Sequence, residues 1–168
     1  MRFIFLIFFS ITTLISSELD ITAKLMPRII LQSSLADKSK DINIAIAYTP
    51  NVMSRALELK RLVSTTAKAH TVKTVLVDVS KKNYSLDNYQ ALYICELEES
   101  NLQRLLKNTR KKQIITFAKN SNQFVKGVMF FIESKRKINI YLNTKSAELA
   151  NIGFNSTLLK YVKTYDKK

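Results

Sequence analysis

Residues 42–48, with the sequence INIAIAY, restrict the fold more than any other segment. Apolar side chains stand at nearly every position, which predicts a strand that is buried on both faces. The chain continues with Thr49-Pro50-Asn51 and then with residues 52–69, where apolar side chains recur every three or four positions and predict an amphipathic helix. A doubly buried strand followed by a tight turn and a helix is typical of α/β proteins.

The rest of the chain extends this alternation. We expect a first helix at residues 19–31, kinked or ended near Pro27, because proline disrupts helical hydrogen bonding. The further predicted elements are strand 71–79, strand 89–95, helix 99–107, strand 113–118, strand 128–133, strand 137–142, helix 144–150 and helix 155–165. The sequence therefore predicts an α/β fold in three layers, with a mixed, mostly parallel sheet, a C-terminal antiparallel hairpin and helices on both faces.

Residues 119–126 connect two of these strands and are too few for the usual crossover between parallel neighbours. We therefore expect strand 128–133 to run antiparallel to strand 113–118 if the two pair. That direction places two basic triplets at the same edge of the sheet. The candidate partner-binding patch consists of Arg110, Lys111, Lys112, Lys135, Arg136 and Lys137. Solvated surface charge without a binding role is the alternative interpretation.

The N-terminus has the order of a secretory signal peptide. Arg2 precedes an apolar run at residues 3–14, and Ser16 and Ser17 follow it. We expect cleavage near residue 17, with retention as a membrane anchor as the alternative. Residues 18–168 then form a single domain, since two glycines and two prolines leave no flexible linker.

The formal net charge of +14 lies mostly in the second half of the chain and favours anionic partners. We expect no nucleic-acid partner, because the sequence contains no recognisable nucleic-acid-binding module. An anionic membrane surface is a candidate partner, and the oligomeric state, including a homodimer, stays open.

Sequence motifs for catalysis, cofactors and metals are absent, so we expect no enzyme activity, no cofactor and no metal site. His70 ends a predicted helix at the surface. Glu96, Glu98, Glu99 and Asp78 follow predicted strands, where they are either an acid–base pair or, as we favour for the glutamates, charges that complement a helix dipole. Cys95 is the chain's one cysteine, and we expect it to pack in the core, with an intermolecular or redox role as the alternative.

The last fifty residues resemble the closing segments of the YfiR-like (HmsC-like) periplasmic proteins. The resemblance lies in residues 114–117, 124–131 and 137–143, in a small-residue segment at 147–150, and in Ile152-Gly153-Phe154 followed by residues 155–160. It extends from about residue 19 to residue 162. The disulfide cysteines of the better-known repressors are absent here.

This resemblance implies an exported α/β domain that works by binding. The best-known members of the YfiR-like family repress a membrane-bound diguanylate cyclase by binding the periplasmic sensor region of that enzyme. The implied function is periplasmic regulation of cyclic-di-GMP signalling and hence of biofilm output, with an inner-membrane cyclase or histidine kinase as partner. A periplasmic solute-binding or accessory transport component and an anionic-surface-binding structural protein are the alternatives.

Overall fold

The computed structural model describes residues 17–36, 41–66 and 71–166. Apart from Ser17, the predicted signal peptide lies outside these residues, and so does His70. Within the described ranges, no helix is both long enough and apolar enough to span a bilayer.

The helices and strands follow in the order α1 (Glu18–Ile30), β1 (Ile42–Tyr48), the 3₁₀ helix η1 (Pro50–Val52), α2 (Met53–Thr66), β2 (Val72–Asp78), β3 (Ala91–Ile94), α3 (Glu99–Lys111), β4 (Ile115–Ala118), α4 (Ser121–Val125), β5 (Phe130–Ser134), β6 (Ile138–Asn143), α5 (Thr144–Leu149), α6 (Ser156–Leu159) and β7 (Val162–Tyr165). α1 continues through Pro27 and ends three residues beyond it.

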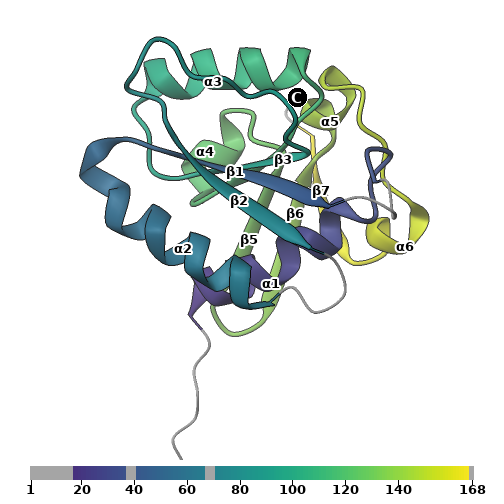
Figure 1. Cartoon of the computed structure of the whole chain (residues 1–168). Helices are drawn as coiled ribbons and strands as arrows, with labels where there is room; N and C mark the ends of the chain where they lie inside the picture. Colours follow the sequence, from purple (N-terminus) through teal and green to yellow (C-terminus); the bar gives the residue numbers. More distant parts are fainter. Residues whose placement is uncertain (1–16, 37–40, 67–70, 167–168) are drawn as a thin grey trace, which may run out of the picture.

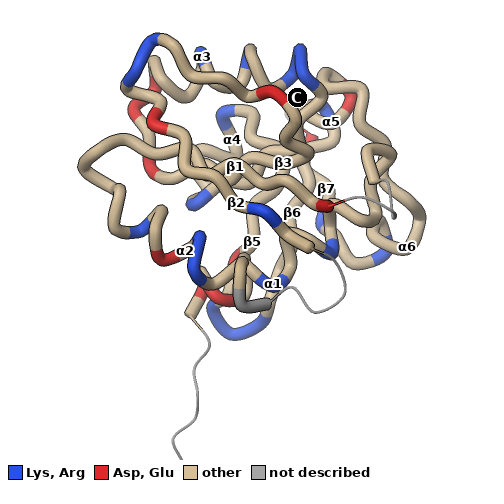
Figure 2. Tube along the Cα trace, viewed as in Figure 1, with Lys and Arg blue, Asp and Glu red and all other residues tan. Residues whose placement is uncertain are grey.

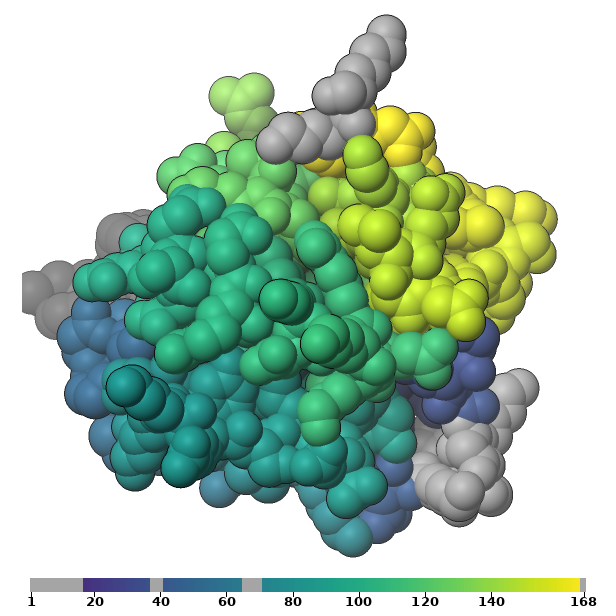
Figure 3. Space-filling model, turned by 90° about the horizontal axis from the view of Figure 1, so that it is seen from above, coloured from purple at the N-terminus to yellow at the C-terminus, as the bar shows by residue number. Residues whose placement is uncertain are grey.

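All seven of these strands form one sheet in the order β2-β1-β3-β4-β5-β6-β7. β5 and β6 are antiparallel, and the other neighbouring strands are parallel. α1 and α2 pack on one face, whereas α3 and α4 pack on the other (Figure 1). Viewed from above, α3 lies across the middle of its face, with α5 to one side (Figure 3). The predicted fold class is confirmed.

β1 shows why the sequence demands helices on both faces. Ile44 and Ile46 belong to the apolar cluster beneath α1 and α2, while Ala45 and Ala47 belong to the cluster beneath α3 and α4. All four side chains are fully buried. The larger residues fill one layer and the smaller ones let the backbone approach the other.

The predicted direction of β5 is wrong. β5 runs parallel to β4, with Phe117 opposite Phe130 and Ala118 opposite Phe131. A crossover with a full-length helix would need more residues than this connection has, but α4 has only five residues. Gly127, at φ +113°, then turns the chain in a conformation that other residues rarely adopt, so a short connection suffices.

The predicted terminal helix at 155–165 is also wrong. The segment divides into α6 and β7, and β7 extends the sheet parallel to β6, with Ile140 opposite Val162. Val162 packs toward the α1 and α2 cluster and Tyr165 toward the opposite cluster, as expected for a strand. Leu159, which the helical pattern places inside, is 46% exposed.

Candidate partner-binding site

The two basic triplets lie at opposite ends of the sheet, so the prediction of a shared edge is wrong. Residues 110–112 close α3 and precede the amino end of β4, whereas residues 135–137 form the turn between β5 and β6. Because β4 and β5 are parallel, the amino end of β4 and the carboxyl end of β5 lie at opposite ends of the sheet. Figure 2 shows the hairpin turn at the bottom of the view and α3 at the top. Whether either triplet binds a partner stays a prediction.

The triplet at the end of α3 is partly engaged within the protein. Arg110 is half-buried, and one of its terminal nitrogens lies 2.9 Å from the position that a Cβ on Gly127 would occupy. Lys112 pairs with Asp87, and this contact, with the Ser85 hydroxyl, lowers the pKa of the Asp87 carboxyl. Lys111 is exposed.

The hairpin triplet is more open to solvent. Lys135 pairs with Glu133 at 3.0 Å, yet 82% of the lysine side chain is exposed. Hydrogen bonding from Lys135 lowers the pKa of Glu133, which therefore stays ionised near neutral pH. Arg136 and Lys137 are exposed, and so is the neighbouring Ile138. The turn thus presents cationic and apolar groups together.

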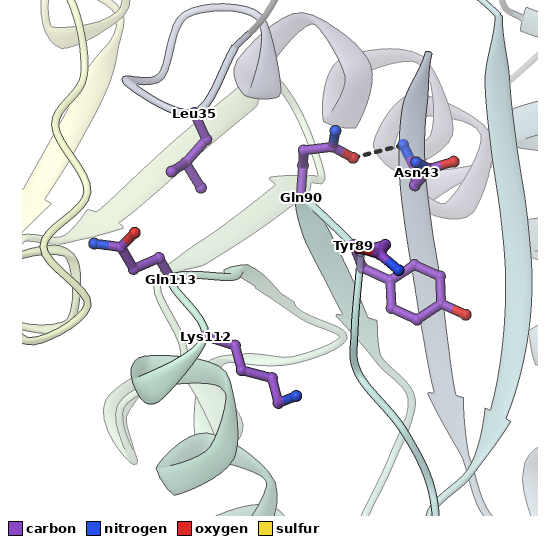
Figure 4. A pocket seen from close by; sticks show the side chains of 7 residues that line it. Leu35, Asn43, Tyr89, Gln90, Lys112 and Gln113 are labelled. Carbon is purple, nitrogen blue, oxygen red and sulfur yellow. Dashed lines mark hydrogen bonds between the residues drawn. The ribbon is translucent and has the colours of Figure 1, made fainter. Parts of the chain in front are cut away.

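A pocket of about 400 Å³ opens at the amino ends of β1, β3 and β4 (Figure 4). The side chain of Gln90 braces it, because its Oε1 accepts a 2.7 Å hydrogen bond from the Asn43 backbone N–H. The lining residues are Leu35, Asn43, Asn88, Tyr89, Gln90, Lys112 and Gln113. Lys112 therefore links the first basic triplet to this pocket.

Two lining residues have unusual backbone conformations. Asn88 has φ 67° and Gln113 has φ 53°, in the left-handed region that non-glycine residues seldom occupy. Such conformations are held by the surrounding structure and cluster at functional sites. The pocket lining offers amide, phenol and ammonium groups for hydrogen bonding. This pocket could not be predicted from the sequence, because its residues come from four separated segments. Asn88 is the one residue whose type hints at the local backbone conformation, since asparagine tolerates positive φ.

The acidic residues after β3 form ion pairs with lysines. Glu96 lies 3.4 Å from Lys119, and Glu99 pairs with Lys126. Glu98 is the exposed N-cap position of α3, and Glu99 lies in the first turn of that helix. These positions agree with charges that complement a helix dipole.

Asp78 accepts hydrogen bonds from the backbone and hydroxyl of Ser80, which lower its pKa. Its role is thus the local one of bracing the turn that follows β2. Among the described residues, no group of three or more His, Cys, Asp or Glu side chains is placed to hold a metal ion.

The YfiR/HmsC-like family model matches residues 32–163 of the sequence. The chain belongs to this family. YfiR/HmsC-like proteins are periplasmic regulatory proteins. The matched range includes every strand of the sheet apart from the last residues of β7. A comparison with curated protein sequences found no match.

Two solved structures share the YfiR/HmsC-like fold seen here at low sequence identity. One is the ABC domain in complex with L-Trp from Streptococcus pneumonia, with a TM-score of 0.59, 12% identity and coverage of 84% of this chain and 59% of that chain. The other is a conserved domain protein from Vibrio cholerae, with a TM-score of 0.63, 10% identity and coverage of 89% and 60%. This chain therefore spans about three fifths of each matched chain.

Cys95 in this YfiR/HmsC-like chain is free and fully buried, so the prediction that it packs in the core is confirmed. Burial raises the pKa of its thiol to about 11, against the opposing effect of the Arg55 and Lys119 charges. Because the thiolate is the reactive form, the thiol is unreactive near neutral pH.

Proposed function

We propose that this chain is a periplasmic regulator that binds the periplasmic sensor region of a membrane-bound diguanylate cyclase and restrains cyclic-di-GMP synthesis. The observation that carries the proposal is the YfiR/HmsC-like match over residues 32–163. On this proposal, residues 1–17 direct export and are removed, and residues 18–168 form the regulatory domain. The chain acts by binding and has no catalytic step of its own.

The charge distribution supports a binding role near the inner membrane. The chain carries a formal net charge of +14, and the hairpin triplet exposes three cationic side chains in one turn. A surface of this kind attracts the acidic face of a partner or anionic lipid headgroups. We propose that residues 135–137 orient the domain toward the membrane and that Lys111, which is exposed, remains available to the partner at the opposite end.

Affinity capture from the periplasm after chemical crosslinking tests the proposal. Cells express the full chain with its own N-terminus and a C-terminal tag, and the captured proteins are identified by mass spectrometry. We expect a membrane protein with a periplasmic sensor region and a cytoplasmic cyclase domain. Capture without crosslinker, and capture with an exported unrelated basic protein of similar size, provide the controls. Recovery of no membrane sensor, cyclase or histidine kinase would contradict the proposal.

A further inference from the structure

β2 forms one free edge of the sheet, and we infer that this edge binds an extended segment of the partner protein as an additional strand. β2 comes first in the strand order and pairs only with β1 among the described strands. Its seven residues span about 23 Å at the usual rise per residue. Figure 1 shows β2 on the near side of the sheet, with helices above and below it. The inference rests on the proposed function, since it assigns the surface through which that partner is bound.

The hydrogen bonds to β1 show which backbone groups of β2 point outward. The Ile42 N–H donates to the Thr71 oxygen at 2.9 Å, and the Val79 N–H donates to the Tyr48 oxygen at 3.0 Å. Thr71 and Val79 thus both bond to β1. In a parallel pair, every second residue of a strand forms its backbone hydrogen bonds with the same neighbouring strand. The odd-numbered residues of β2 therefore face β1. The N–H and C=O groups of Val72, Thr74 and Leu76 face away from the sheet, as a template for another strand.

A hollow of about 290 Å³ lies directly beside this edge. It is lined by Tyr48, Val75, Leu76, Val77, Asp78, Lys81, Asn83, Tyr84, Ser85 and Tyr89. Val75 is 43% exposed there, although it is an apolar residue in a sheet. Alternate side chains of an added strand point to the Val75 side of the sheet, so one of them can enter the hollow. Backbone pairing with a side-chain pocket is the usual basis of strand addition.

Tyr84 adds an unsatisfied polar group to the wall of the hollow. Its hydroxyl is buried but has no hydrogen-bond partner among the described residues. The Arg104 guanidinium lies 5.9 Å from the centre of the tyrosine ring and donates to the Val79 carbonyl at 2.7 Å, so this wall of the hollow is held in place. A buried hydroxyl without a partner is unfavourable, so the wall of the hollow keeps one unsatisfied polar group.

Charge identifies the chemistry of the segment. Lys81 and Asp78 both line the hollow, and Lys82 follows them, so two exposed lysines stand beside one carboxylate. A second copy of this chain carries the same net charge of +14, which disfavours pairing of two β2 edges. The occupant is therefore an extended segment of net negative charge that places an apolar side chain beside Val75.

Site-specific photocrosslinking compares the two edges of the sheet. A photoreactive residue replaces Lys73 on β2 in one strain and Tyr161, which is 75% exposed and precedes β7 at the opposite edge, in another. We expect the membrane sensor to be crosslinked from position 73 with at least tenfold higher yield than from position 161.

Two variants of the position-73 protein, together with one control variant, test the mechanism. Thr74→Pro removes an outward N–H without removing a bond to β1, and proline is tolerated on edge strands. We expect it to lower the yield at least tenfold, whereas Thr74→Ala, which keeps the N–H, stays within twofold. Val75→Glu places a negative charge beside the segment and leaves the backbone unchanged, so it also lowers the yield at least tenfold. Circular dichroism verifies that each variant is folded.

The outcomes separate this inference from the proposed function. A sensor crosslinked mainly from position 161, or equally well in Thr74→Pro and Val75→Glu, overturns the edge-binding inference and leaves the proposed function standing. Crosslinking to a second copy of this chain overturns the inference, because the strand added at this edge then comes from this chain and not from the membrane sensor. Failure to crosslink a membrane sensor from either position overturns the edge-binding inference, and the proposed function is contradicted only if the affinity capture also recovers no such sensor.

Discussion

The side-chain amide of Gln123 donates a 2.7 Å hydrogen bond to the backbone carbonyl of Cys95. The same side chain accepts a 3.0 Å hydrogen bond from the Lys119 backbone N–H. One buried glutamine thus ties α4 to the ends of β3 and β4. This contact stabilises the short parallel crossover that the sequence analysis did not anticipate.

Replacing Gln123 with methionine is expected to destabilise the protein by about 2 kcal/mol, because a buried carbonyl and a backbone N–H both lose their partner. Methionine keeps the length of the side chain, so the effect of lost packing is small. The matched control is Gln103→Met on α3, where the glutamine is exposed and the expected change is within about 0.5 kcal/mol. Guanidinium denaturation followed by circular dichroism measures both. Equal midpoints for the two variants would contradict this role of Gln123.

The two glycines of the chain are expected to respond differently to alanine. Gly127→Ala forces a Cβ onto φ +113° and should destabilise the protein by about 1–3 kcal/mol. Its 2.9 Å clash involves the end of the Arg110 side chain, which is free to shift, so the backbone conformation accounts for most of the loss. Gly153→Ala meets only Ser34, at 3.9 Å, and should change stability by less than about 0.5 kcal/mol. Thermal unfolding of both variants compares them; the reverse order would refute the assigned role of Gly127.

Stability is expected to fall in alkaline solution because of Cys95. Its thiol has a pKa of about 11 in the folded protein and an ordinary value of 9.0 when unfolded. The unfolded chain therefore loses the proton first. The contribution of Cys95 to the free energy of unfolding is fully present below pH 9. About 2–3 kcal/mol of it is lost as the pH rises to about 11.

The Cys95→Ala variant isolates this effect in denaturation curves measured from pH 7 to pH 10. Burial also raises the pKa of Tyr93, but from an ordinary value of 10.0, so its influence begins at higher pH. Between pH 9 and 10 the wild-type protein should lose stability while the variant stays nearly constant. Parallel declines in the two proteins would show that Cys95 is not responsible.

Reversing the hairpin charges is expected to weaken attachment to anionic membranes. The triple change Lys135→Glu, Arg136→Glu and Lys137→Glu should lower binding to vesicles of mixed phosphatidylglycerol and phosphatidylcholine at least tenfold at low salt, since each cation near such a surface contributes about 1 kcal/mol. Vesicle sedimentation measures the bound fraction. Lys111→Glu with Lys112→Glu changes the opposite end of the sheet and serves as the control, with an expected change below twofold. Unchanged binding of the triple variant at low salt would exclude the hairpin as a membrane contact.

The sequence predicted the central part of the fold because burial there is local and periodic. The INIAIAY strand and the helix after it were recognised from side chains that repeat every residue or every three to four residues. The cap of α5 was also predictable, since the Asn143 side chain accepts a hydrogen bond from the Ser146 N–H at 3.0 Å.

The errors lie where a few long-range contacts override the local pattern. Gln123 and Gly127 permit a parallel crossover of one short helix, and no spacing in the sequence announces that contact. The last segment contains both Leu158 at helical spacing and Val162 at strand spacing, and the open side of β6 decides between them. The misplacement of the basic triplets follows from the first of these errors.

The cellular concentration of cyclic-di-GMP, measured by mass spectrometry after deletion of this chain's gene, tests the proposed function most directly. We predict that deletion raises the concentration severalfold, that the exported wild-type chain restores it, and that a version lacking residues 1–17 does not. A concentration that stays the same after deletion, in a cell where the captured cyclase is present, would contradict the account.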